Sequence, residues 1–252
     1  MFHKIYLAYV AMAFLISLLL ILPFVLFSVF FGIYWGGKIM GRCVGVATLF
    51  WLFLIGVRHT NIDKHQHIEH HKSYIFIANH RSYFDAPLLV AAMWGVSFRV
   101  LAAAEFGRFP IWKTLYRYVT VMVDRTNEDN KAKSMRMMKL FLDKGISIFI
   151  FPEGKINQSQ DYLLPFHSGA FRIAIETQTD IIPIVLSNSA SILDIKKGLS
   201  SLRWGRTAAQ FLKPISVQNY TSDDIQTLKK TCFEVLENHL KNRQSKNNSF
   251  YS

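Results

Sequence analysis

The sequence has few cysteines and few acidic residues. Its two cysteines, Cys43 and Cys232, lie far apart, so the 252-residue chain has neither a disulfide framework nor a cysteine-ligated metal site. Aspartate and glutamate number 17 against 29 lysines and arginines, a formal net charge of +12. This charge favours anionic membrane surfaces or phosphorylated ligands. Nucleic acid is a poorer partner, because the basic residues are scattered and no nucleic-acid-binding motif is present.

Residues 5–37 lack charged side chains altogether. A helix needs about 20 apolar residues to cross a bilayer, and this run is longer. A cleaved signal peptide would have a shorter apolar core and a small-residue cleavage site, and no Ala-x-Ala pattern follows. A second apolar stretch, residues 43–57, fits a returning half-hairpin, an interfacial helix or a helix packed on the first, after a turn at Gly36-Gly37. We therefore expect a membrane-anchoring helical segment over residues 1–57, with one or two spans.

Beyond residue 57, short apolar runs alternate with amphipathic segments. Strands are expected at residues 74–78, 98–104, 119–123, 146–151, 181–186 and 208–217. Helices are expected at residues 86–94, 111–119, 127–144, 169–177 and 222–240. The alternation predicts an α/β domain over residues 58–240, with a largely parallel sheet flanked by helices and a ligand site at the carboxyl ends of the strands. Residues 241–252 are expected to form a polar, disordered tail.

The stretch IFIANHRSYFDAPLL, residues 75–89, places a histidine and an aspartate where an apolar strand ends. His80 is suited to proton transfer near neutral pH, and the Asp85 carboxylate could fix its tautomer. No serine nucleophile is needed if the substrate brings its own hydroxyl. Asp85 could equally be a helix N-cap and His80 a hydrogen-bonded loop residue, because spacing alone is a weak signal.

Two further strand ends carry polar groups. IFIFPEGK, residues 148–155, ends in a tight turn that presents Glu153 and backbone N–H groups. VMVDRT, residues 121–126, places Arg125 where it could bind a phosphate bidentately. Taken singly, the first is a common turn and the second a surface arginine.

Together these stretches resemble the glycerolipid acyltransferases typified by the 1-acylglycerol-3-phosphate acyltransferases. NHRSYFD resembles their His-x4-Asp box, FPEG their Pro-Glu-Gly box, MVDR the arginine block between them and IIPIV their last apolar block. The resemblance covers residues 58–240. It implies a membrane-bound enzyme that moves a fatty acyl group from a thioester donor to the hydroxyl of a lysophospholipid, foremost 1-acylglycerol-3-phosphate, to give phosphatidate.

The resemblance also implies roles for single residues. His80 would be the general base that deprotonates the acceptor hydroxyl, and Asp85 would orient it. The glycerol-phosphate part of the acceptor would be bound by Arg125, Glu153, Gly154 and Lys155. Acyl-CoA or acyl carrier protein would be the co-substrate, with no other cofactor.

Two positions depart from the family's pattern. The Pro-Glu-Gly box usually continues with Thr-Arg, whereas Lys155-Ile156 follows here. The downstream Phe-Lys-x-Gly is FHSG, residues 166–169, with His167 in the lysine position. Both changes affect the expected phosphate site, so another lysophospholipid or hydroxylated lipid could be the acceptor instead. The same His–Asp pair would also serve a lipid ester or thioester hydrolase, and a non-enzymatic membrane-surface protein could have this fold.

The segment HQHIEHH contains His65, His67, His70 and His71. Imidazoles bind transition metals, but the segment precedes the first expected strand, where a solvated loop is expected, and the family needs no metal. We therefore expect no metal site. The expected partners are lipids of the membrane, and the basic residues after Arg58 favour a catalytic domain on its cytoplasmic face.

Overall fold

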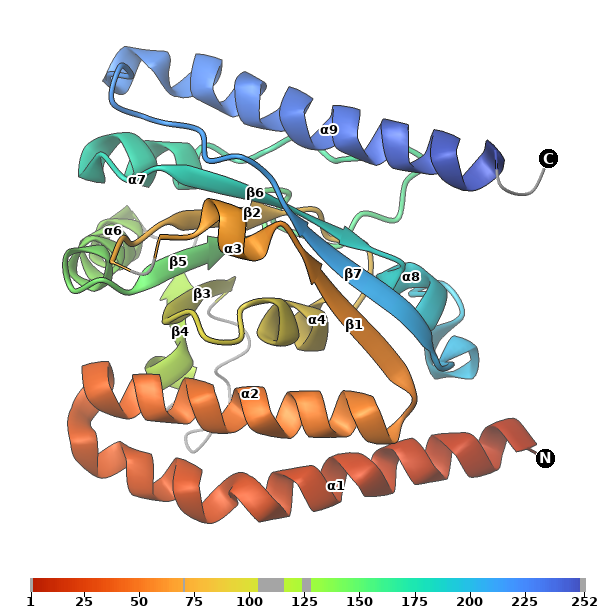
Figure 1. Ribbon diagram of the computed structural model, residues 1–252. Helices are drawn as coiled ribbons and strands as arrows, with labels where there is room; N and C mark the ends of the chain where they lie inside the picture. The colour runs from red at the N-terminus through yellow and green to blue at the C-terminus, as the bar shows by residue number, and fades with distance from the viewer. Residues whose placement is uncertain (1, 70, 104–115, 124–127, 250–252) are drawn as a thin grey trace.

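The computed structural model describes residues 2–69, 71–103, 116–123 and 128–249 (Figure 1). The strands are β1 (Val57–Ile62), β2 (Ile75–Ala78), β3 (Phe98–Ala103), β4 (Thr120–Val123), β5 (Ser147–Ile150), β6 (Ile181–Ser187) and β7 (Gly205–Phe211). The α-helices are α1 (Phe2–Ser28), α2 (Gly37–Leu54), α3 (Lys64–His67), α4 (Asp85–Ala92), α6 (Glu128–Asp143), α7 (Gly169–Thr177), α8 (Ser189–Ile192) and α9 (Ile225–Ser249). The short 3₁₀ or π turns are η1 (Val29–Phe31), η2 (Gly32–Gly36), η4 (Gly198–Ser201) and η5 (Ser222–Asp224).

In the described part of the chain the strands form one 7-stranded sheet, in the order β1-β7-β6-β2-β5-β3-β4. β2 pairs in parallel with β5 and β6, and β3 pairs in parallel with β5 and β4. β7 is antiparallel to β6 and parallel to β1, so these two strands run opposite to the other strands. The expected α/β fold with a largely parallel sheet is confirmed.

The side chains of β2 alternate between two apolar cores, as expected for a strand covered on both faces. Ile75 and Ile77 pack in the core formed with α6, α7 and α9. Phe76 and Ala78 pack on the opposite face, in the core formed with α4. Figure 1 shows the resulting layers: helices α6, α7 and α9, then the sheet, then α4, and finally the hairpin of α1 and α2.

The α1–α2 hairpin lies lengthwise along the domain (Figure 1), so the second apolar stretch is a helix packed on the first. The buried guanidinium of Arg99 donates to the carbonyl oxygen of Ile33 at 3.1 Å and thereby ties the hairpin to β3. The turn expected at Gly36-Gly37 lies earlier in the chain, because the reversal takes place over residues 29–36, which end at Gly36, and Gly37 already belongs to α2. Gly37 instead permits close packing, since a Cβ there would overlap the Arg99 guanidinium.

Other elements differ from the sequence expectations at their ends. The sequence does not predict β1, because most residues of VRHTNI are polar. Polar residues are tolerated in this strand because it lies at the edge of the sheet. β7 covers residues 205–211, not 208–217. α9 runs through most of the expected tail, to Ser249, because residues 241–249 contain no glycine or proline to stop the helix. Residues 116–119 are helical, and the rest of the helix expected at 111–119 lies outside the described residues.

Candidate active site

The carboxyl ends of β2 and β5 lie side by side, because these strands are parallel neighbours in the sheet. His80 lies just beyond β2, and Glu153 lies just beyond β5. The backbone N–H of His80 donates to Glu153 Oε1 at 2.7 Å. The Asn157 N–H donates to the carbonyl oxygen of His80, also at 2.7 Å. The sheet therefore joins the two motifs into one site.

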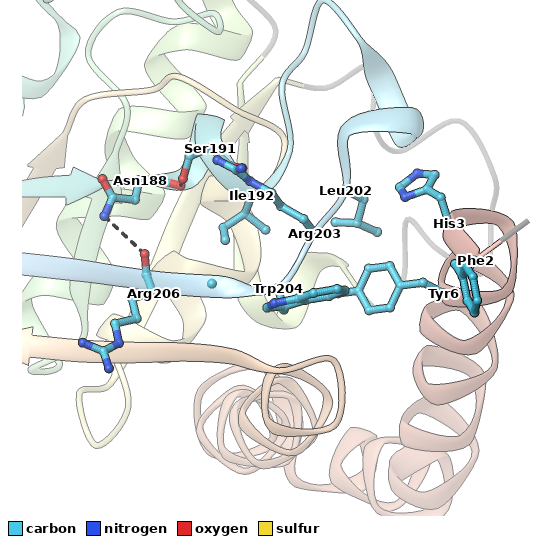
Figure 2. Close-up of a pocket in the computed structure, with 11 residues that line it drawn as sticks. Phe2, His3, Tyr6, Asn188, Ser191, Ile192, Leu202, Arg203, Trp204 and Arg206 are labelled. Carbon is cyan, nitrogen blue, oxygen red and sulfur yellow. Dashed lines mark hydrogen bonds between the residues drawn. The ribbon is translucent and has the colours of Figure 1, made fainter.

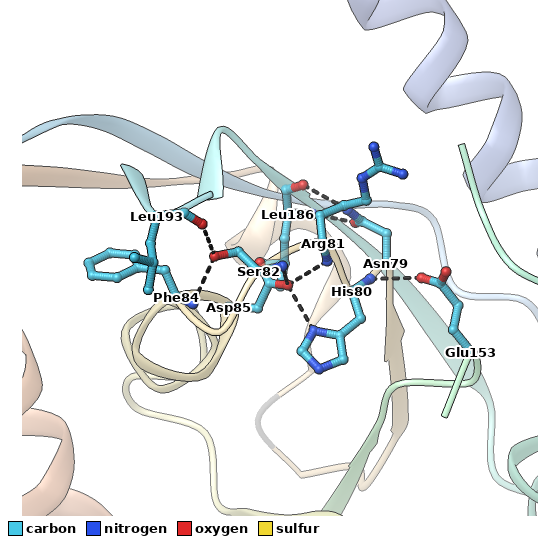
Figure 3. A network of polar contacts seen from close by, with 9 residues as sticks. All are labelled: Asn79, His80, Arg81, Ser82, Phe84, Asp85, Glu153, Leu186 and Leu193. Carbon is cyan, nitrogen blue, oxygen red and sulfur yellow. Dashed lines mark hydrogen bonds and ion pairs between the residues drawn. The ribbon is translucent and has the colours of Figure 1, made fainter. Parts of the chain in front are cut away.

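Asp85 holds the His80 ring from the first turn of α4 (Figure 3). Its Oδ2 accepts a hydrogen bond from His80 Nδ1 at 2.8 Å. The same oxygen accepts the backbone N–H groups of Arg81 and Ser82 at 2.7 and 2.8 Å. Asp85 makes no capping hydrogen bond to α4, so the interpretation of Asp85 as an ordinary N-cap is wrong. With the proton on Nδ1, the free lone pair is on Nε2, as a general base requires.

The imidazole of His80 also stacks on the ring of Phe151, with centroids 4.0 Å apart and an angle of 15° between the planes. The Asp85 side chain is fully buried, whereas 18% of the His80 side chain is exposed. Among the described residues Nε2 has no hydrogen-bond partner. The ring is thus held by a hydrogen bond and a stacking contact, and part of it stays accessible to a ligand.

Glu153 is only 2% exposed, and both of its oxygens accept backbone hydrogen bonds. Oε1 accepts the His80 N–H, and Oε2 accepts the Leu164 N–H at 2.8 Å. Burial raises the pKa of the Glu153 carboxyl, and the hydrogen bonds from Leu164 and His80 oppose that rise. The geometry differs from the expected contact with an acceptor, because the carboxylate ties the His80 loop to the loop before α7.

The turn after β5 is closed by Gly154, whose φ of 71° favours glycine and whose N–H donates to the Phe151 carbonyl oxygen at 3.0 Å. The next residue, Lys155, is exposed. The backbone N–H of His167 donates to the Pro152 carbonyl oxygen at 2.8 Å. The two positions that depart from the family's pattern therefore lie on adjoining loops.

A family model described as Acyltransferase matches residues 59–187, just over half of the chain and the part that contains this site. The chain belongs to this acyltransferase family. The resemblance inferred from the four motifs is thereby confirmed.

Named relatives of this acyltransferase agree with that assignment. The chain is 29% identical over 173 residues to a 1-acyl-sn-glycerol-3-phosphate acyltransferase of Haemophilus influenzae, a match that covers 66% of this chain and 68% of the relative. It is 28% identical over 209 residues to a protein of the same name from Limnanthes douglasii, covering 81% of this chain and 70% of the relative. The crystal structure of the 1-acyl-sn-glycerophosphate (LPA) acyltransferase PlsC from Thermotoga maritima has the same fold, with a TM-score of 0.74 at 20% identity over 96% of this chain and 98% of that one.

Two expectations for the acyltransferase fall outside the described residues. Arg125 belongs to the undescribed stretch between β4 and α6, and His70 is also undescribed. Within the residues that the structure describes, no group of three or more His, Cys, Asp or Glu side chains gathers around a possible metal position. The expectation that Arg125 binds a phosphate and the expectation that the histidine segment binds no metal both stay predictions.

Three residues that support the acyltransferase site were not predicted from the sequence. Phe151 stacks on His80, as described above. The Asn79 side chain accepts the Leu186 N–H at 2.8 Å and donates to the Leu186 carbonyl oxygen at 2.9 Å, which fixes the end of β2 against β6. The Ser82 hydroxyl donates to the Leu193 carbonyl oxygen at 2.6 Å. Their position beside motif residues was the one available signal, and it does not reveal their partners.

Proposed function

We propose that this acyltransferase transfers a fatty acyl group from a thioester donor to the free hydroxyl of 1-acylglycerol-3-phosphate, which gives phosphatidate. The observation that carries the proposal is the His80–Asp85 pair, in which Nδ1 is held by the carboxylate and Nε2 is left for a substrate hydroxyl. The acceptor is supported by the names of the relatives. Acyl-CoA or acyl carrier protein would supply the thioester.

In the proposed reaction, Nε2 of His80 takes the proton of the acceptor hydroxyl while the hydroxyl oxygen attacks the thioester carbonyl carbon. The tetrahedral intermediate then collapses, the C–S bond breaks, and the imidazolium gives its proton to the leaving thiolate. The products are an ester and a free thiol. Asp85 stabilises the imidazolium that exists between the two proton transfers.

We propose that the acceptor phosphate binds beside the turn after β5. This turn adjoins the base, because Glu153 connects it to the His80 backbone. Lys155 would act there as a point charge, with the Gly154 backbone beside it, and Arg125 would bind bidentately. His167 stands at the sequence position of the family's lysine, on a loop whose backbone contacts this turn, and would be a second contact for the phosphate.

Glu153 is proposed to position His80 and not to touch the acceptor. Glu153→Gln keeps one acceptor atom and leaves the N–H of His80 or Leu164 unpaired, at a cost of about 1–3 kcal/mol in the free energy of unfolding. We expect kcat to fall about tenfold, less than the roughly 10²-fold cost of a 1 Å misplacement. The acceptor KM should stay nearly unchanged.

The two effects are separated by measuring kcat and the acceptor KM in steady-state kinetics over a range of acceptor concentrations. Glu176→Gln, on the exposed side of α7, is the control. A higher acceptor KM at unchanged kcat would instead assign Glu153 to the substrate.

The α1–α2 hairpin is proposed to attach the acyltransferase to a membrane. Residues 2–54 include a helix that is long and apolar enough to span a bilayer, and only 22% of its most apolar window is buried. The hairpin packs lengthwise on the domain (Figure 1), so a crossing α1 would carry the domain into the hydrocarbon. We therefore place the hairpin in the plane of the interface, on the cytoplasmic face. The acceptor lipid and the product would then lie in the same bilayer.

The proposed activity can be tested with purified protein in detergent micelles, a panel of lysophospholipids and one acyl thioester. Lipid mass spectrometry should show loss of 1-acylglycerol-3-phosphate and gain of phosphatidate, with an equal amount of free thiol. Acylation of a different lysophospholipid would show that this lipid, and not 1-acylglycerol-3-phosphate, is the acceptor. Release of free fatty acid without an acylated lipid would identify a hydrolase, and unchanged lipids across the panel would contradict the proposal.

A further inference from the structure

The connection between β6 and β7 meets the first turn of α1 around a pocket of about 670 Å³ (Figure 2). Both segments contribute to its walls, which include Phe2, His3, Tyr6, Arg203, Trp204 and Arg206. Among the described residues that line it there is no aspartate or glutamate. Two segments that lie far apart in the sequence thus form one basic and aromatic pocket at the start of the apolar helix α1.

Trp204 is held against the hairpin but remains mostly exposed. Its ring meets the ring of Tyr6 edge to face, with centroids 5.4 Å apart and an angle of 82° (Figure 2). The Tyr6 hydroxyl in turn donates to the carbonyl oxygen of Ile55 at 2.9 Å. Even so, 66% of Trp204 is exposed. A fixed, exposed indole suits the interface of a bilayer, where tryptophan is enriched because one part of its ring system is apolar and the other is polar.

The segment that carries Trp204 is basic. Residues 194–206 contain four basic side chains and one acidic side chain. The basic side chains are Lys196, Lys197, Arg203 and Arg206. Within the described part of the chain, none of the four forms an ion pair. Arg203 and Arg206 lie on opposite sides of the β7 ribbon (Figure 2), so each side of the ribbon carries one guanidinium group near Trp204 in the sequence. Guanidinium groups are well suited to bind phosphate.

The other end of the hairpin has a similar composition. Trp35 is 69% exposed, and the ammonium group of Lys38 lies 5.2 Å from the centre of its ring. Arg42 follows one turn later on α2. Between the two ends, α1 exposes a series of large apolar side chains, including Leu19, Phe24 and Phe27. Aromatic and basic groups thus bracket an apolar helix, which is the composition of a surface that lies on an anionic bilayer.

We propose that residues 194–206 form a second membrane contact, in which headgroup phosphates of anionic phospholipids bind at Arg203 and at Arg206 while Trp204 enters the interface. The inference rests on the proposed membrane placement of the hairpin and goes beyond it. A hairpin lying in an interface leaves the domain free to roll about the hairpin axis. A contact contributed by the β6–β7 connection, which lies off that axis, fixes the roll and with it the orientation of His80 toward the lipid surface.

The test measures quenching of single tryptophans by brominated phospholipids. The protein is reconstituted into vesicles of phosphatidylglycerol and phosphatidylcholine, in which either the first lipid or the second carries bromine on its acyl chains. The difference in quenched fluorescence between wild type and Trp204→Phe gives the contribution of Trp204. The same difference between wild type and Trp35→Phe gives the contribution of Trp35 on the hairpin. No turnover is needed, so the result does not depend on the identity of the acceptor.

We expect Trp204 to be quenched more by brominated phosphatidylglycerol than by brominated phosphatidylcholine at the same overall composition. Each basic residue near an anionic surface strengthens binding roughly fivefold, so Arg203→Gln with Arg206→Gln should weaken the preference for the anionic lipid by roughly 30-fold and abolish the excess quenching. Arg172→Gln with Lys230→Gln is the matched control, because both residues are exposed on the helices of the opposite side of the sheet. This control should keep the excess. Inorganic phosphate added to the vesicles should leave it unchanged.

Each other outcome overturns the inference. Equal quenching by the two lipids would place Trp204 in the bilayer without an anionic headgroup site. Loss of the excess in inorganic phosphate would assign the pocket to a free anion. Quenching of Trp35 without quenching of Trp204 would leave the hairpin as the membrane anchor and remove the second contact. If neither Trp35 nor Trp204 were quenched, the proposed placement of the hairpin in the membrane interface would be wrong as well. A midpoint of thermal unfolding equal to that of wild type in uncharged micelles verifies that the double arginine variant is folded.

Discussion

His80→Ala is expected to lower the rate of acyl transfer by about 10²–10⁴, the usual contribution of a positioned general base. The reason lies in the geometry of the ring. Nδ1 is bound to Asp85, the ring plane is stacked on Phe151, and Nε2 is the nitrogen left to accept a proton. Alanine removes the proton acceptor and leaves the Glu153 contact intact, because that contact uses the backbone N–H of residue 80.

The measurement is the initial rate of phosphatidate formation, together with the midpoint of thermal unfolding. His239→Ala is the matched control, since His239 is an exposed histidine on α9. The control should match wild type in rate, and His80→Ala should unfold near the wild-type temperature. Phosphatidate formation at the wild-type rate in a folded His80→Ala protein would remove His80 from the mechanism.

The order of strands and helices in the domain could be predicted from the sequence because a buried strand and an amphipathic helix differ in the period of their apolar residues. β2, β5 and β6 are apolar on both faces and short, and they lie where they are expected. β1 could not be found in this way, because an edge strand needs few apolar residues. The hairpin turn could not be placed either, since glycine serves both in turns and in close helix packing, and Gly37 serves the second purpose.

For the candidate site, the chemistry of single residues was predictable, but their partners were not. That β2 and β5 are neighbours is a property of the sheet, and no local pattern around His80 reveals it. The role expected for Glu153, a contact with the acceptor, came from the family resemblance, and the sequence around the residue does not indicate that its side chain is buried. Its burial and its two backbone donors depend on the loop that contains Leu164, which folds back over the turn. Arg125 lies outside the described residues, so its place in the site stays a prediction.

Asp85→Asn is expected to lower kcat roughly 10²-fold while the His80 tautomer is preserved. Asp85 Oδ2 accepts two backbone N–H groups besides the ring N–H. An asparagine must therefore place its carbonyl oxygen there, because its NH₂ group would face two donors. Nδ1–H then still has an acceptor, but a neutral one, and hydrogen bonds to charged groups are worth about 1.5–3 kcal/mol. A change of tautomer would cost more, about 10⁴ in a comparable His–Asp pair.

Asp85→Ala provides the comparison that separates charge from loop geometry. It leaves the N–H groups of Arg81 and Ser82 without their acceptor, so we expect a loss of about 1–3 kcal/mol in the free energy of unfolding for each, and a larger loss of kcat than in Asp85→Asn. Denaturant unfolding and kcat are measured on both variants. Asparagine loses less stability, although its NH₂ group takes the buried place of Oδ1, which has no partner in the described residues. If the asparagine variant were as inactive as the alanine variant at wild-type stability, the backbone N–H groups would not fix the tautomer. If it kept full activity, the mechanism would not need the charge of Asp85.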